Sequence, residues 1–333
     1  MDASRCRSRM LVDTKWRDLY TTLIVPVEGT DEGLEELVVA IFESSGMFPK
    51  NDGYHISTKL YSMVSAVRRQ YNPNHYHCFL HACHVLVNCA KILGDIVSVH
   101  PQLPKVEGLA VLFAAIIHDV GHLGVSNATL SHENHKLAII YSDQSIAEMH
   151  SLACAFQLLN QPDNDILCHL SEGERKVFRG LVIDLVLGTN VMDNERQQLL
   201  QKNLENTSKS AARVDLEIQT NRTVIFNLVM RAADVGAQMQ NIETSRIWSK
   251  RFFLEQREAR NAGRMPHTDG KEFCLQHGRF VERHAAVLAA ALASTGNLTS
   301  SLSLEILEST HKNLNVWGIE GPSLVEEWCN LPP

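Results

Sequence analysis

Hydrophobic residues recur three and four positions apart along most of the chain, which is the spacing of one face of an α-helix. The pattern is clearest in residues 34–46, 79–93, 145–159, 176–188, 222–236 and 280–294. Segments containing Pro, Gly, Asn or Asp separate the helical stretches, at residues 47–53, 71–74, 100–105, 160–165 and 293–297. Alternating runs typical of strands are scarce, so the pattern predicts an all-α fold of about a dozen or more short helices.

The size of the chain fits one large domain. With 333 residues, 44% hydrophobic and 21% charged, it can bury a sizeable core. We expect a helical extension over residues 1–50 and one large compact helical domain over residues 51–333. The extension either packs on this domain or connects it to a regulatory region outside the chain.

Charge and cysteine usage exclude several protein classes. The net charge of −7 argues against binding to a nucleic acid polymer, which requires a basic face. The eight cysteines include no C-x-x-C pair and suit free thiols in a reducing compartment. Residues 1–20 carry charges throughout, unlike a signal peptide. The apolar runs 108–117 and 285–293 are about half the length of a transmembrane helix. We therefore expect a soluble, cytoplasmic protein without a transmembrane segment.

One apolar run ends in groups that are expensive to bury. The stretch AAIIHDVGHLG places His118, Asp119 and His122 directly after buried-type residues. A buried charge is costly unless it is paired or bound to a metal. Taken alone, this segment can also be explained without a metal, by buried histidines that hydrogen-bond the backbone.

Further metal-type side chains occur on other predicted helices. His77 and His81 lie four residues apart and therefore share one helix face, and Asp234 closes the apolar stretch 222–236. Singly, each is more simply a surface or packing residue, as are Glu148 and His150. Together, imidazole and carboxylate groups form a ligand set for Zn, Mn, Fe or Mg. Such a site activates water and can clamp a phosphoryl group, which points to hydrolysis of a phosphate ester.

Several motifs, in order, resemble those of class I cyclic nucleotide phosphodiesterases, which belong to the HD-domain phosphohydrolases. YNPNHYHCFLHACHVL resembles their Y-H-N-x-x-H-A-x-D-V signature, and HDVGHLGVSN resembles H-D-x-x-H-x-G-x-x-N. Similar matches occur in LAIIYSDQSIAEMHSLACAFQLL, FRGLVIDLVLGTN, RAADVG and RFFLEQREARNAG followed by QHGRFVERHAAVL. The resemblance runs from about residue 54 to 300 and implies that family's compact helical fold with a buried two-metal site.

The resemblance also implies roles for individual residues. His81, His118, Asp119 and Asp234 would hold a first divalent ion, expected to be Zn, and Asp119 would bridge to a second, Mg or Mn. His77 would be the general acid in hydrolysis of a 3′,5′-cyclic nucleotide (cyclic AMP, cyclic GMP or both) to the 5′-monophosphate by a metal-bridged hydroxide. The outer shell would comprise His122, Glu148 and Thr189, and the substrate would contact Tyr76, Gln276, His277 and Phe280.

The chain departs from the family pattern at seven positions. These are Cys78, His84, Gly121, Asn190, Ala237, Arg251 and His277. An ungapped alignment of RFF puts Arg251 in place of a Glu that bonds the general-acid histidine, and a cation there would disfavour protonated His77. His277 stands where the family has its purine-binding Gln, with Gln276 one residue out of register. An imidazole cannot reproduce the two-bond pattern of an amide, which leaves base preference open.

Three functions are compatible with these residues. Retention of His77 and of all four ligand residues favours an active cyclic nucleotide phosphodiesterase. The substitutions at Cys78, Arg251 and His277 instead favour an impaired domain that binds nucleotide or a protein partner. An altered base pocket would suit a hydrolase of another phosphate ester. The resemblance is compatible with a homodimer or with a regulatory domain outside this chain.

Overall fold

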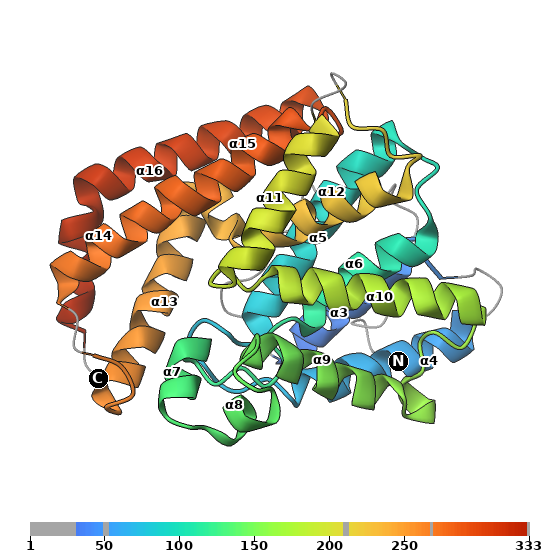
Figure 1. The fold of residues 1–333 in the computed structure, drawn as a ribbon, viewed down its shortest axis with the longest axis horizontal. Helices are drawn as coiled ribbons and strands as arrows, with labels where there is room; N and C mark the ends of the chain where they lie inside the picture. The colour runs from blue at the N-terminus through green and yellow to red at the C-terminus, as the bar shows by residue number, and fades with distance from the viewer. Residues whose placement is uncertain (1–30, 49–52, 209–212, 267–268, 332–333) are drawn as a thin grey trace, which may run out of the picture.

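The computed structural model describes residues 31–48, 53–208, 213–266 and 269–331. These residues form helices and connecting turns with no strand among them, which confirms the all-α prediction (Figure 1). The elements are α3 (Asp31–Ser44), α4 (Gly53–Arg68), α5 (Phe79–Val99), α6 (Lys105–Ile117), α7 (Asn127–His132), α8 (Lys136–Ile140), α9 (Ile146–Leu159), η2 (Pro162–Asn164), α10 (Glu172–Gly188), α11 (Asn194–Ser208), α12 (Gln219–Asp234), η3 (Gly236–Met239), α13 (Ile242–Asn261), α14 (Gly270–Phe280), η4 (Val281–Ala285), α15 (Ala286–Ser294) and α16 (Ser300–Cys329).

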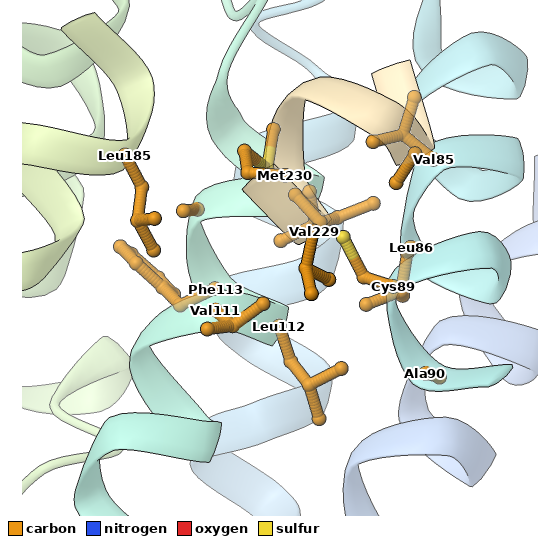
Figure 2. Packing of buried hydrophobic residues seen from close by; sticks show 14 of the residues in the cluster. Val85, Leu86, Cys89, Ala90, Val111, Leu112, Phe113, Leu185, Val229 and Met230 are labelled. Carbon is orange, nitrogen blue, oxygen red and sulfur yellow. The ribbon is translucent and has the colours of Figure 1, made fainter. Parts of the chain in front are cut away.

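The main hydrophobic core lies between α5, α6, α10 and α12. Figure 2 shows Val229 and Met230 of α12 beside α5, with Leu185 of α10 and Phe113 of α6 closing the other side. All four of these side chains are fully buried or nearly so. Apolar residues on several faces of α5 and α6 are buried, as expected for helices in the middle of a core.

Two smaller clusters flank this core. One joins α13, α14 and α16 through Phe253, Phe273 and Trp317. The other joins the turn after α6 to α7, α8 and α9 through Val125, Leu130 and Ile146. In Figure 1, α14, α15 and α16 lie together, while α7 and α8 lie beside the start of α9.

A single π-helical turn, η4, joins α14 to α15 without a break. Such turns insert an extra residue into a helix and rotate its later turns relative to its earlier ones. Phe280, the last residue of α14, stands directly before this turn. The apolar spacing of residues 280–294 predicts one continuous helix and gives no sign of the π-turn.

The N-terminal extension is described only in part. The expectation for residues 1–30 lies outside the described residues. Helix α3, from the same expected extension, packs on α4 and α5, and its Val38 and Phe42 belong to the main core.

Within the described residues, α5 alone is long and apolar enough to cross a membrane. Of its most apolar 18-residue window, 78% is buried inside the protein. A core helix of a folded domain has this composition, and α5 occupies that place here.

Candidate active site

Four side chains from three parts of the fold converge at one point. His81 lies in α5, His118 and Asp119 directly follow α6, and Asp234 ends α12. His118 Nε2 lies 3.2 Å from Asp119 Oδ2 and 3.4 Å from Asp234 Oδ1. His81 Nε2 lies 3.1 Å from Asp234 Oδ1 and 3.7 Å from Asp119 Oδ2. Four ligands at bond lengths of about 2.0–2.2 Å stand about 3.3–3.6 Å apart in a tetrahedron, so this spacing suits one metal ion.

The cluster also has the unpaired atoms that a cation would satisfy. His118 Nδ1 donates to the Ala115 carbonyl over 2.9 Å, which leaves the Nε2 lone pair facing the carboxylates. His118 Nε2 and Asp119 Oδ2 are buried without a hydrogen-bond partner. Burial lowers the pKa of His118, but the Asp119 and Asp234 carboxylates outweigh it and raise that pKa well above its ordinary value. The cluster therefore favours positive charge, and its donors fit a divalent metal ion.

His77 is held by a carboxylate that the sequence analysis did not assign. Its Nδ1 pairs with Glu255 Oε1, while Glu255 Oε2 accepts the backbone N–H groups of Tyr76 and His77 at 2.7 and 2.9 Å. Burial lowers the pKa of His77, but the charge of Glu255 outweighs it and raises that pKa to about 9. His77 therefore carries a proton at neutral pH and has Nε2 available for a ligand.

The expectation for Arg251 is wrong. Arg251 does not pair with His77: its Nη1 donates to the His75 carbonyl over 3.0 Å, and its guanidinium lies 5.6 Å from the Trp248 ring centroid. Glu255 follows Arg251 by one turn of α13, and this turn brings the carboxylate under the His77 ring. The carboxylate that pairs with His77 thus comes from four residues after Arg251.

His122 stacks on His77, with ring centroids 3.9 Å apart and an interplanar angle of 28°. Burial, together with the positive charge of His77, lowers the pKa of His122 to about 4. Gly124 N–H donates to His122 Nδ1, and the side chains of Asn72 and Asn74 donate to the His122 carbonyl. His122 is therefore a neutral ring held rigidly beside the charged one.

A cavity of about 520 Å³ opens where the three hydrophobic clusters meet. Asp119 and Asp234 border it beside His77 and His122, and His81 and His118 stand behind the two carboxylates. The other six predicted site residues also line it: Tyr76, Glu148, Thr189, Gln276, His277 and Phe280. The structure thus brings all twelve predicted residues to one site.

The wall formed by α9 and the end of α10 is polar. Burial raises the pKa of Glu148, whose Oε2 accepts a hydrogen bond from Asn127 over 2.9 Å. The Thr189 hydroxyl donates to the Val186 carbonyl over 2.8 Å. Asn190 is engaged at both ends of its amide, since Nδ2 donates to the Ser145 hydroxyl and Oδ1 accepts the Met192 N–H. It therefore ties two cavity loops together.

Aromatic rings from α14 form another part of the cavity wall. His277 is buried and stacks on Phe273 at an interplanar angle of 9°, with Phe280 6.3 Å away between centroids. Gln276 is exposed at the cavity rim and donates to Glu272 Oε1 over 3.0 Å. Of these two neighbouring residues, His277 is the one built into the wall.

Two other departures have structural explanations. Gly121 adopts a φ of +74°, and a Cβ there would meet the His150 ring at 2.9 Å. His84 stacks on Trp248 at 5.0 Å and donates to Gln240 Oε1 over 3.3 Å. Sequence reasoning missed Glu255, Trp248, Ser249 and Gln238 as cavity residues. The available signal was that each polar residue shares a helix face with an aromatic one: Ser249 lies four residues before Phe253, and Glu255 lies seven residues after Trp248.

Comparisons with known proteins identify the family of the chain. The family described as 3′5′-cyclic nucleotide phosphodiesterase matches residues 76–277. A probable 3′,5′-cyclic-AMP phosphodiesterase pde-4 of Caenorhabditis elegans is 33% identical over 60% of this chain and 30% of its own length. The 3′,5′-cyclic-AMP phosphodiesterase 4C of Rattus norvegicus is 30% identical over 62% of this chain and 39% of its own length. The match therefore spans about a third of these relatives.

Solved structures show the same fold. The phosphodiesterase domain of the rhodopsin phosphodiesterase of Salpingoeca rosetta superposes with a TM-score of 0.79 at 24% identity, over 100% of this chain and 98% of that one. A second structure of this domain, from the RhoPDE fusion protein, gives a TM-score of 0.78 at 23% identity, over 99% and 100%. The family match covers more than half of the chain and includes His77, Glu255 and the metal-type cluster of His81, His118, Asp119 and Asp234. The chain belongs to the 3′,5′-cyclic nucleotide phosphodiesterase family.

Proposed function

We propose that this protein hydrolyses a 3′,5′-cyclic nucleotide to the 5′-monophosphate with the help of two divalent ions. The observation that carries the proposal is that the metal-type residues and His77 lie at the same cavity. The imidazoles of His81 and His118 contact the carboxylates of Asp119 and Asp234 beside a charged His77, and both carboxylates and His77 border one cavity large enough for a nucleotide. Membership of the family supports the same chemistry.

His81, His118, Asp119 and Asp234 would hold the first ion, for which zinc suits the mixed nitrogen and oxygen donors. The second ion, magnesium or manganese, would share Asp119 and otherwise be coordinated by water that Glu148, His122 and Thr189 orient. Such ions polarise the phosphate and make bound water nucleophilic at neutral pH.

The chain's own residues supply the proton. As a water oxygen bonds to phosphorus and releases its proton to solvent, the bond from phosphorus to the ribose 3′ oxygen breaks, and His77 Nε2 donates its proton to that leaving oxygen. His77 then regains a proton from solvent. Glu255 keeps the His77 ring charged and fixes its direction through Nδ1. Phe280 and Tyr76 would shape the substrate pocket around the base and the ribose.

The proposal is tested by measuring hydrolysis of cyclic AMP and cyclic GMP with added Zn plus Mg or Mn. The Asp234→Ala variant, which loses a ligand, is expected to lower kcat/KM by about a hundredfold or more and to lose bound zinc. Asp163→Ala is the matched control, because Asp163 is exposed in η2 and outside the cavity. Zinc content is read by elemental analysis of the purified proteins.

The possible results separate the candidate functions. Turnover that Asp234→Ala abolishes and Asp163→Ala retains supports the proposal. Cyclic nucleotide binding without turnover would overturn it in favour of a sensing domain. Turnover only of other phosphomonoesters or phosphodiesters would assign the same centre a different substrate. A cytoplasmic location, and an N-terminal extension over residues 1–50 whose helix α3 packs as part of the catalytic domain, also belong to this proposal.

A further inference from the structure

Four buried polar side chains form a chain that ends at the cavity wall. Ser245 and Ser249 lie in α13, Gln238 lies in η3, and His277 lies in α14. Their exposed fractions run from 0% at Ser245 to 6% at His277. Consecutive members are 2.7, 3.1 and 2.9 Å apart, in the order Ser245, Gln238, Ser249, His277. The mechanism proposed above uses none of the first three.

The direction of these hydrogen bonds follows from satisfying every buried proton. The Ser245 hydroxyl donates to Gln238 Oε1, and Gln238 Nε2 donates to the Ser249 oxygen. Ser249 then has its own proton left for the next bond, so it donates to His277 Nε2. With the reverse direction, the Ser245 proton would lose the acceptor that the structure gives it, in a fully buried place. An unsatisfied buried hydroxyl costs about 1–3 kcal/mol, which favours the first direction.

The tautomer of His277 is thereby fixed. Burial lowers the pKa of His277 to about 4, so the ring is neutral and carries one proton. Because Nε2 accepts from Ser249, the proton is on Nδ1. Among the described residues, Nδ1 has no hydrogen-bond partner, and the ring borders the cavity. Phe273 and Trp317 hold the ring in place, with the Trp317 centroid 4.4 Å away.

We propose that His277 reads the base with a single N–H donor, and that Ser245, Gln238 and Ser249 act as positioning residues that set its direction. This inference rests on the proposed function. The ligand class is a 3′,5′-cyclic purine nucleotide with a hydrogen-bond acceptor at ring position 1. Adenine has such an acceptor, whereas guanine and hypoxanthine carry N1–H there, which would face the donor of His277.

A lone donor has a second consequence. An amide side chain could pair both with N1 and with the 6-amino group of adenine, but His277 offers no acceptor to that amino group. Removing the amino group therefore leaves no group of His277 unpaired. A site rejects strongly only those analogues that leave its own buried polar groups unsatisfied.

The experiment compares kcat/KM for cyclic AMP, the cyclic monophosphate of purine riboside (no 6-amino group) and cyclic IMP (N1–H). The purine riboside compound is expected within about threefold of cyclic AMP, and cyclic IMP at least about tenfold below it. Dissociation constants measured on the His77→Asn variant give the same ratios without turnover. Failure of the proposed catalytic function is thus distinguishable from failure of this inference.

Variants test the positioning role. Ser249→Ala releases Nε2, so His277 can take either tautomer, and the preference for cyclic AMP over cyclic IMP should shrink to about threefold or less. His277→Gln supplies an acceptor, and the purine riboside compound should then fall at least about threefold behind cyclic AMP. Lys271→Ala is the control on the same helix, because Lys271 is exposed and outside the cavity, and its ratios should match those of the parent.

Three results would overturn the inference. The first is a parent protein that rejects the purine riboside compound tenfold or more, because its 6-amino group is then read by an acceptor. The second is a Ser249→Ala variant, folded by circular dichroism, with the parent's preference unchanged. The third is a change of preference in Gln276→Ala alone, which would make Gln276 the residue that contacts the base.

Discussion

At the scale of single residues, Glu255 organises the proton donor. One carboxylate binds the His77 ring with Oε1 and two consecutive backbone N–H groups with Oε2. Glu255→Gln keeps the shape but removes the charge that raises the pKa of His77. His77 is protonated below its pKa, so activity is lost as pH rises through it. In the variant this loss should move to lower pH, and kcat should fall about tenfold or more at pH 8 and less at pH 6.

A pH profile of kcat for both proteins measures this shift. Glu258→Gln is the matched control on the same helix, because Glu258 is 70% exposed and pairs only loosely with His75 at 3.7 Å. Its profile should coincide with that of the parent. An unchanged basic limb in Glu255→Gln would mean that another group sets the charge of His77.

Site residues could be predicted from the sequence where both the type of side chain and its spacing along the chain were distinctive. Two histidine pairs at i, i+4 and the apolar run that ends in His118 and Asp119 indicated a metal site from the sequence. Glu255 was missed because one acidic residue among several in α13 has no such signature. Its role depends on which turn of α13 faces His77, and that is decided by tertiary packing.

At the scale of elements, the turn after α6 positions three site residues. Gly121 has a φ of +74° there, and its N–H donates to the Gln70 carbonyl over 3.1 Å. Gly121→Ala would place a Cβ in left-handed backbone and against the His150 ring. We expect the free energy of unfolding to fall by about 1–3 kcal/mol. Denaturant unfolding followed by circular dichroism measures it.

Gly180→Ala provides the opposite expectation. Gly180 lies on the exposed side of α10, where a Cβ meets nothing within 4 Å. Alanine should raise the free energy of unfolding by about 0.5–1 kcal/mol, through helix propensity alone. Equal effects of the two substitutions would show that the turn tolerates a side chain and that the strain at Gly121 is absent.

Helix positions were predictable because apolar spacing and breakers are local signals. The stretch 176–188 was expected as helical, and α10 spans Glu172–Gly188, starting at a capping box formed by Ser171 and Glu174. The π-turn Val281–Ala285 was not predictable, since its apolar pattern reads as ordinary helix. It depends on the packing of α14 and α15 against α16.

At the scale of the whole molecule, the cavity exists because the three hydrophobic clusters do not merge. Val235 of the main cluster, Phe273 of the α13–α14–α16 cluster and Val125 of the α7–α9 cluster all border it. The sequence predicted which residues are apolar but not how they divide among clusters. The outline of the cavity, and the way His277 and Gln238 meet in it, therefore could not be predicted without the fold.

The metal-type cluster ties together parts of the chain that are distant in sequence, so metal binding should stabilise the whole fold. His81 on α5, His118 and Asp119 after α6, and Asp234 on α12 can hold one ion only when all three helices are in place. A ligand that binds only the folded state at a hundred times its Kd adds about 2.7 kcal/mol to the free energy of unfolding. Zinc should therefore raise Tm, and a chelator should reverse the rise. Asp234→Ala should abolish this response in thermal unfolding while Asp163→Ala retains it. A zinc response of equal size in both variants would place the bound ion elsewhere on the chain.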